Sequence, residues 1–220
     1  MLTIYSEPVS LYCAKLRVLM RHKTLHWNDL PPPGGYGSDE YRAIVPSGNL
    51  PAMVHDGFML ADSEAIAEYL EETFPETPML PDTIKARAKV REMGRLHDTR
   101  LEPAVRLLYP HVAYDNRDDK AVRAAVTAID KALASLDLLL SQDDLPTGQL
   151  WLGDCGFVVC FAWIKAFETA LCLPITWPDA VVTYDQQLNT YPAVRAELAA
   201  YAPAMAAYLR KAEPPGSRQK

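Results

Sequence analysis

The residues best placed for chemistry lie near the start of the chain, where a serine follows an apolar segment. Residues 2–5 predict a short strand, and Ser10 is the expected N-cap of a helix that continues to about Lys23. The first turn of a helix has unpaired N–H groups and a partial positive charge, so it stabilises a thiolate or another bound anion. The Ser10 hydroxyl would donate a hydrogen bond to such an anion, although helix capping alone also explains a serine here.

A second serine stands at another expected helix start. Asp62 is the natural N-cap, and Ser63 lies in the first turn, ahead of apolar residues that recur at helical spacing as far as Phe74. The free N–H groups of this turn would bind a small carboxylate. Capping by itself explains the Asp-Ser pair equally well.

The elements between these two serines predict a mixed sheet. Residues 25–30 indicate a second strand, which completes a parallel βαβ unit with the first strand and helix. After a loop rich in proline and glycine and a short helix at 39–44, Asp56-Gly57 marks a two-residue turn between antiparallel strands. Pro51 precedes the first of these strands, and an X-Pro bond at such a tight turn can be cis.

Everything beyond the segment 75–82 is predicted to be helical. Three prolines in these eight residues indicate a linker between two domains. The first helix should kink near Pro103, and the third should be buried on nearly all sides. The expected helices span residues 85–109, 121–140, 151–171, 178–189 and 192–201, followed by a polar segment, 213–220, that is expected to fray.

Composition and charge exclude several classes of protein. The 220-residue chain is 49% hydrophobic, and its net charge of −6 argues against non-specific nucleic-acid binding, which needs clustered Lys and Arg. No apolar run approaches the ~18 residues of a membrane span, and no signal peptide is recognisable. The four cysteines form no Cys-x-x-Cys pair and a chain of this size needs no disulfides, so a reducing cytoplasm is expected. The five histidines show no ligand spacing with one another or with cysteine, so no metal site is expected.

Four features, taken in order, resemble the cytosolic glutathione transferases, in particular the serine-type bacterial members near the zeta, omega and etherase-like classes. They are Ser10 placed seven residues before Arg17, the segment 47–54 with its Leu-Pro pair, the segment 62–70 that opens with Asp-Ser, and the linker at 75–81. Leu-Pro or Asp-Ser alone is a weak signal, whereas the first three stretches in this order and spacing are specific. The resemblance covers essentially the whole chain.

The resemblance implies a fold and an assembly. A thioredoxin-like glutathione-binding domain of βαβ-ββα order is expected over residues 1–80. An all-helical domain that contributes the electrophile site is expected over residues 86–220. Members of the family usually form homodimers, so the expected partners are glutathione, a hydrophobic or aromatic electrophile and a second copy of the chain.

The resemblance also implies an activity. Glutathione transferases activate the thiol of glutathione for attack on an electrophilic carbon, commonly in detoxification. Ser10 matches the residue that donates a hydrogen bond to the thiolate, with Tyr12, Ser6 and Cys13 as alternative donors. Isomerisation, ether cleavage or dehalogenation on the same site, or a non-catalytic glutathione-binding module, are the alternative functions. The residues implied in glutathione binding are Ser10, Asn49, Leu50, Pro51, Asp62 and Ser63.

The electrophile is expected between the loop before Ser10 and the first long helix of the second domain. Ordinary helix surface also explains any single polar or aromatic residue of this region. The candidates there are His97, Arg100, Tyr109, His111 and Tyr114.

Overall fold

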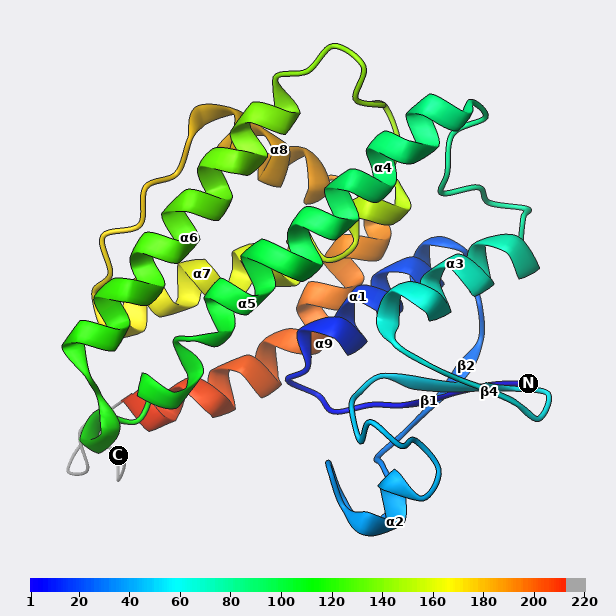
Figure 1. The fold of residues 1–220 in the computed structure, drawn as a ribbon, viewed down its shortest axis with the longest axis horizontal. Helices are drawn as coiled ribbons and strands as arrows, with labels where there is room; N and C mark the ends of the chain where they lie inside the picture. The colour runs from blue at the N-terminus through cyan, green and yellow to red at the C-terminus, as the bar shows by residue number, and fades with distance from the viewer. Residues whose placement is uncertain (213–220) are drawn as a thin grey trace.

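The structure, a computed structural model that describes residues 1–212, combines a four-stranded sheet with a larger set of helices (Figure 1). The order of the strands across the sheet is β2-β1-β3-β4. Strand β1 pairs with β2 in parallel and with β3 antiparallel, and β3 and β4 are antiparallel. The predicted βαβ unit and hairpin are therefore confirmed. The strands are β1 (Leu2–Tyr5), β2 (Trp27–Leu30), β3 (Ala52–His55) and β4 (Phe58–Ala61).

Two local backbone features shape the β3–β4 hairpin. Asp56 and Gly57 have positive φ angles of 48° and 88°, as a two-residue turn of type I′ requires, so β3 returns directly as β4. The Leu50–Pro51 bond that precedes β3 is cis, the form that the sequence allows at this position.

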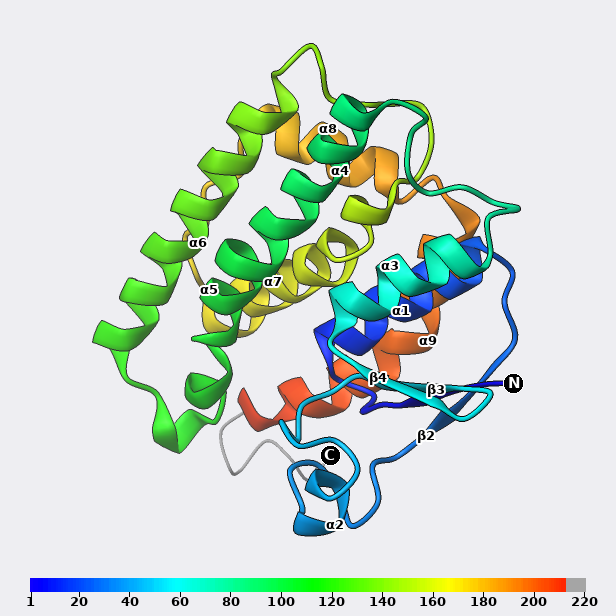
Figure 2. The ribbon, with the colours of Figure 1, turned by 45° about the vertical axis from the view of Figure 1, so that its right-hand side comes forward.

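Helices α1 (Leu11–His22) and α3 (Ser63–Thr73) cover the sheet face that looks toward the helical half, and the short α2 (Asp39–Arg42) lies on the other side (Figure 1). Helix α1 contacts α3 beside it and α7 and α9 of the helical half. Figure 2 shows the same order of layers from a second direction. Because α1 is enclosed from both sides, every residue from Cys13 to Met20 is buried.

The helical half shares one hydrophobic core with the sheet region. A single apolar cluster extends from the sheet through α1 to α7, whose side chains Trp163 and Phe161 are fully enclosed. The prediction of a buried central helix is thereby confirmed. The helices of this half are α4 (Ile84–Leu96), α5 (Glu102–Arg106), α6 (Asp119–Leu140), α7 (Phe157–Leu171), α8 (Asp179–Leu188) and α9 (Pro192–Leu209). Short 3-10 turns lie at Tyr109–His111, Tyr114–Asn116, Leu152–Asp154 and Arg210–Ala212.

The break in the first long helix differs from the predicted proline kink. Residues His97–Leu101 form a π-helix between α4 and α5, so the irregularity precedes Pro103 instead of centring on it. Pro103 lies in the first turn of α5, where a missing N–H costs no hydrogen bond. π-Helical turns are rare and are frequently found at functional sites.

Two other helix boundaries differ from the predicted ones. Helix α7 begins six residues later than expected, because Asp154 Oδ2 accepts the N–H of Trp151 at 2.7 Å and closes a 3-10 turn. Helix α9 continues past its predicted end at residue 201, through an exposed Pro203, because Tyr208 still packs on the aromatic core. The predicted frayed segment 213–220 lies outside the described residues.

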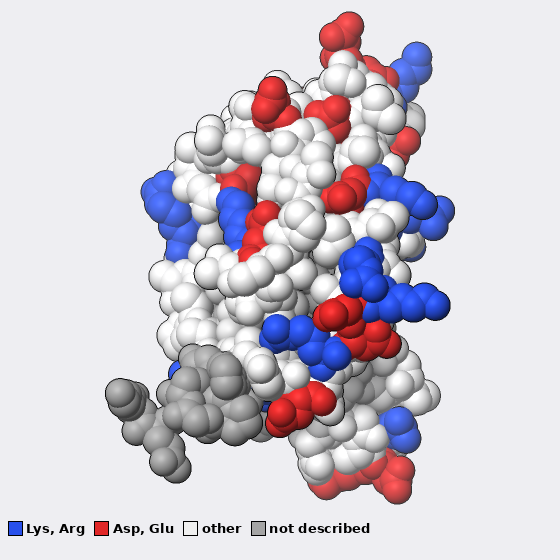
Figure 3. Space-filling view, turned by 90° about the vertical axis from the view of Figure 1, so that its left-hand side faces the viewer, with Lys and Arg blue, Asp and Glu red and all other residues white. Residues whose placement is uncertain are grey.

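Buried ion pairs join the sheet region to the helical half. Glu197 of α9 accepts hydrogen bonds from Arg17 Nε at 2.7 Å and Arg21 Nε at 2.9 Å, both on α1. On the surface the charges are mixed, and the face in Figure 3 shows Lys and Arg side chains interspersed with Asp and Glu. Within residues 1–212, no helix combines the length and the apolar character that a bilayer span requires.

Candidate functional site

The register of the sheet brings three chain segments to one edge. Tyr5 pairs with Ala52, and Ala52 pairs with Ala61. The loop that follows β1, the Leu50–Pro51 bond and the start of α3 therefore lie side by side. This arrangement follows from strand pairing alone, before any side chain is considered.

A cleft of about 790 Å³ opens at this edge, between the sheet region and the helical half. One wall contains all six residues implied in glutathione binding, namely Ser10, Asn49, Leu50, Pro51, Asp62 and Ser63. The structure thus brings together residues that are up to 53 positions apart in the sequence. Their roles in binding stay predictions.

Ser10 is the N-cap of α1, as predicted. Its φ and ψ angles of −74° and 123° are extended, and its Oγ accepts the N–H of Cys13 at 3.3 Å. Accepting this bond leaves the hydroxyl hydrogen of Ser10 free to point at a neighbouring anion, since a hydroxyl both donates and accepts. Capping and anion binding are therefore compatible at this residue.

The alternative donors near Ser10 are engaged elsewhere. Ser6 is buried outside the lining of the cleft and donates to Asp29 Oδ1 at 2.7 Å. Cys13 is fully buried, and this burial raises the pKa of its thiol. Tyr12 lines the cleft, but its hydroxyl donates to Glu102 Oε2 at 3.0 Å. Burial and the Glu102 carboxylate both raise the pKa of the Tyr12 phenol well above its ordinary value.

The start of α3 presents one serine to the cleft. Asp62 is the N-cap as predicted, and its Oδ1 accepts the N–H groups of Glu64 at 2.9 Å and Ala65 at 3.1 Å. Ser63, next in the chain, lines the cleft and is 6% exposed. A carboxylate docked here would meet the N–H and hydroxyl of Ser63 and the positive end of the helix.

One of the five candidates for the electrophile site lines the cleft, and the other four lie elsewhere. Tyr109 lines the cleft, whereas Arg100, His111 and Tyr114 lie outside its lining. His97 is completely buried. It faces the helical core, where its Nε2 lies 3.3 Å from Cys160 Sγ and its ring packs edge-on against Phe157.

The helical half instead presents a charged face that sequence reasoning missed. Arg95, Asp98, Glu102 and Arg106 line the cleft opposite the serines. Their spacing of three or four residues is that of a single helix face, and this pattern is visible in the sequence. A cleft-facing role could have been inferred from it only by knowing that this face meets α1.

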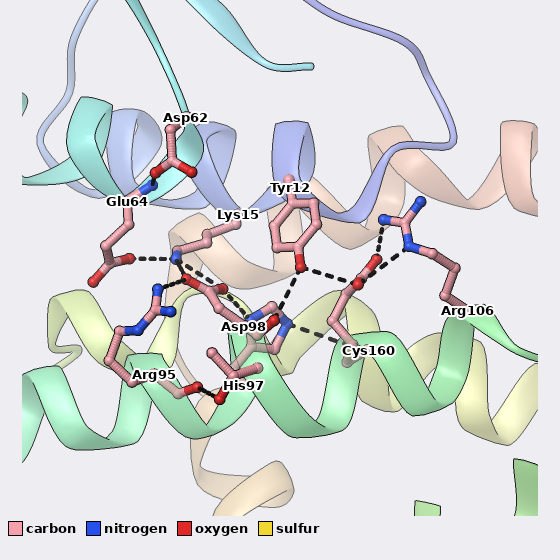
Figure 4. A network of polar contacts seen from close by, with 11 residues as sticks. Tyr12, Lys15, Asp62, Glu64, Arg95, His97, Asp98, Arg106 and Cys160 are labelled. Carbon is pink, nitrogen blue, oxygen red and sulfur yellow. Dashed lines mark hydrogen bonds and ion pairs between the residues drawn. The ribbon is translucent and has the colours of Figure 1, made fainter. Parts of the chain in front are cut away.

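The charged face is tied to the sheet region by buried polar contacts (Figure 4). Lys15 of α1, which is 2% exposed, pairs with Glu64 of α3 and with both carboxylate oxygens of Asp98, at 3.0 and 3.1 Å. Burial opposes ionisation of Asp98, but the hydrogen bond from His97 and the charge of Lys15 hold the pKa of its carboxyl below the ordinary value. These contacts hold the two walls of the cleft, one from the sheet region and one from the helical half, in a fixed relative position.

Comparison with known proteins identifies the family. The family model described as "Glutathione S-transferase, N-terminal domain" matches residues 4–78. A maleylacetoacetate isomerase of Dictyostelium discoideum is 31% identical over 168 residues, which cover 76% of this chain and 70% of that protein. The "Probable maleylacetoacetate isomerase 2" of Drosophila melanogaster is 29% identical over 88% of this chain and 86% of its own length.

Solved structures show the same fold. A theta-class glutathione S-transferase from Xanthomonas axonopodis pv. citri, determined with glutathione bound, superposes with a TM-score of 0.74 at 22% identity and covers 89% of this chain and 96% of its own. The glutathione transferase URE2P6 of Phanerochaete chrysosporium, in complex with oxidised glutathione, superposes with a TM-score of 0.76 at 17% identity. The match covers 92% of this chain and 96% of that chain. By sequence and by fold, the chain belongs to the cytosolic glutathione transferase superfamily, a family of glutathione-dependent enzymes.

Proposed function

We propose that the protein binds glutathione in the 790 Å³ cleft and uses Ser10 to stabilise its thiolate for attack on an electrophilic small molecule. The observation that carries this proposal is the convergence of two serine-bearing helix starts on one cleft. In the proposed complex, the backbone of Leu50 pairs with the cysteinyl residue, and Asp62 and Ser63 hold the γ-glutamyl end. Asn49 lies where the glycine carboxylate would end.

The free energy needed to lower the pKa of the glutathione thiol is within the range that such a site can supply. An unperturbed thiol titrates near pH ~8.5, and lowering its pKa by about two units takes ~2.7 kcal/mol of preferential binding to the thiolate. A charge-assisted hydrogen bond contributes roughly 1.5–3 kcal/mol and a helix start ~0.3–2 kcal/mol. The thiolate then forms the S–C bond while the electron pair of the broken bond leaves with the departing group or moves into the conjugated system.

A Ser10→Ala variant tests the assigned donor. With glutathione bound, the ultraviolet absorbance of the thiolate should disappear while binding of glutathione is retained. Ser6→Ala is the matched control, because this serine lies in the same loop but outside the lining of the cleft, and it should keep the thiolate signal. An unchanged signal in Ser10→Ala would reject Ser10 as the donor.

A glutathione-dependent isomerisation is the second candidate, and the named relatives favour it. The thiolate would add to a double bond conjugated with a carbonyl, which converts it to a single bond that can rotate. Expulsion of the same sulfur restores the double bond and returns glutathione unchanged. Product analysis separates the two outcomes, because isomerisation consumes no glutathione and conjugation consumes one equivalent.

We further propose the division into residues 1–80 and 86–220 and assembly as a homodimer. The hydrogen bonds at the start of the linker support this division. Lys23 Nζ donates to the carbonyls of Phe74 at 2.9 Å and Thr77 at 2.8 Å, which anchors the first residues of the linker to the end of α1. The mass of the protein in solution, measured by light scattering, should be twice the 24.5 kDa of one chain.

A further inference from the structure

Two arginines, Arg95 and Arg106, line the cleft. Their guanidinium groups differ in how closely each is paired with a carboxylate. Arg106 donates to both carboxylate oxygens of Glu102, from Nε at 3.3 Å and from Nη2. Within residues 1–212, the partner of the Arg95 guanidinium is Asp98 Oδ2 at 3.6 Å from Nη1, too far for a hydrogen bond. Asp98 already accepts the shorter bonds from Lys15. Arg95 therefore keeps its five N–H donors for a ligand.

The packing of α4 on α3 fixes the part of the helix that carries Arg95. Arg91, one turn earlier on α4, donates to Glu68 of α3 from Nε at 2.6 Å and Nη2 at 2.7 Å. A Cβ built on Gly94 would lie 3.4 Å from Glu64 Oε1, so α4 meets the first turn of α3 at this point. Arg95 follows directly, and Figure 4 shows it at the same end of the polar network as Glu64.

The start of α3 has one set of donors left to offer. Asp62 Oδ1 occupies the N–H groups of Glu64 and Ala65, which leaves the N–H and the hydroxyl of Ser63, a residue that lines the cleft. The Ser63 side chain is 6% exposed, and within the described residues its hydroxyl has no hydrogen-bond partner. These donors can serve one oxygen of a carboxylate, which leaves the second oxygen for a donor on the opposite wall.

We infer that Arg95 is that donor and binds the α-carboxylate of the γ-glutamyl group of glutathione across from Ser63. The inference rests on the proposed function and extends it, because it makes the helical half a direct contributor to glutathione recognition. The planar guanidinium fits a carboxylate through two parallel hydrogen bonds. The α-ammonium group of the same ligand would then have a carboxylate on each wall of the cleft, Asp62 on one and Asp98 on the other.

The first test compares affinities for S-methylglutathione, whose sulfur cannot react, by isothermal titration calorimetry. Arg95→Gln should bind roughly tenfold more weakly, as expected for loss of a charge-assisted hydrogen bond at a partly exposed site. Arg95→Lys keeps the charge without the planar fork and should fall in between. Arg91→Gln is the matched control, since this arginine faces Glu68 outside the lining of the cleft, and should bind like the unmodified protein.

A ligand analogue identifies the group that Arg95 recognises. Replacing the γ-glutamyl residue of S-methylglutathione with 4-aminobutyrate removes only the α-carboxylate, and Arg95→Gln should bind this analogue as well as the unmodified protein does. An equal loss with both ligands, or no loss with either, overturns the role of Arg95. Failure of the unmodified protein to bind S-methylglutathione would instead reject the proposed function itself. Far-ultraviolet circular dichroism verifies that each variant is folded.

Discussion

Lys15 Nζ lies 3.0 Å from Asp98 Oδ2, although 83 residues separate the two in the sequence. The same ammonium group pairs with Glu64, and it is 2% exposed. Burial by itself would lower the pKa of this lysine, but the charges of Glu64 and Asp98 raise it above its ordinary value. Helices α1 and α3 and the π-helix are thus joined at a single buried cation beside the cleft.

Removing this cation should destabilise the fold strongly. Lys15→Met removes the buried cation from two partly buried carboxylates, Glu64 and Asp98, and breaking a buried ion pair in this way costs about 3–5 kcal/mol. The free energy of unfolding, measured by urea titration, should fall by this amount. Lys89→Met is the control, because its ion pairs with Glu92 and Asp144 are exposed and should contribute little. Equal urea midpoints of unfolding for Lys15→Met and Lys89→Met would contradict a stabilising role for the buried Lys15 ion pairs.

Tyr12→Phe should separate the roles of Tyr12 and Ser10. The Tyr12 hydroxyl donates to Glu102, which is 2% exposed, so its loss should lower the free energy of unfolding by ~1–3 kcal/mol. The thiolate absorbance of bound glutathione should persist, because this hydroxyl is already committed to a carboxylate. Loss of that absorbance in Tyr12→Phe, with the variant folded, would transfer the donor role from Ser10 to Tyr12.

Gly156→Ala, at the N-cap of α7, should destabilise the protein. A Cβ at this position would overlap the ring of His97, at 2.5 Å from Cε1 and closer still to Nδ1, and His97 is completely buried. Overpacking of this kind costs ~1–3 kcal/mol, and alanine is also a poorer residue than glycine at an N-cap.

Gly94→Ala, within α4, is the counterpart. The nearest atoms to its added Cβ would lie at 3.4 Å, an ordinary contact distance, so this variant should be as stable as the unmodified protein or more so. Thermal unfolding monitored by circular dichroism compares the two. A higher melting temperature for Gly156→Ala than for Gly94→Ala would show that His97 is not held where the structure places it.

Asp154→Asn should change the pH dependence of stability. Burial raises the pKa of the Asp154 carboxyl to about 6, against the hydrogen bonds from Tyr184 and Trp151 that favour its ionised form. The folded protein therefore holds this proton more tightly than the unfolded chain does. Its contribution to stability is complete below pH ~4 and is lost as the pH rises through about 6, a change of ~3 kcal/mol.

Urea titrations at several pH values between 4 and 7 measure this contribution. Asparagine does not titrate, so the stability of Asp154→Asn relative to the unmodified protein should rise across this interval. Parallel stability curves for the two proteins would contradict a raised pKa of Asp154.

Features that depend on a few neighbouring residues were predictable from the sequence. The N-caps at Ser10 and Asp62 and the turn at Asp56-Gly57 follow from the preferences of the residues at those positions, and the structure contains all three. The predicted serines also lie on one cleft, because the order of short strands and helices permits few sheet topologies.

The opposite wall of the cleft could not be predicted in the same way. The sequence contains the regular spacing of Arg95, Asp98, Glu102 and Arg106 on one helix face, but nothing near them in the chain indicates which helix face meets α1. The π-helix at His97–Leu101 also alters the phase of the helix, so that His97 points into the core while Glu102 reaches Tyr12.

The sequence by itself therefore determined where the helices of the sheet region begin and which hydroxyls stand at their starts. Only the tertiary structure decided which charges face those hydroxyls. The physical reason is one of range, because a cap or turn is settled within about four residues. By contrast, the contact between Tyr12 and Glu102 joins side chains 90 residues apart. It forms only when α1 and the helical half have packed together.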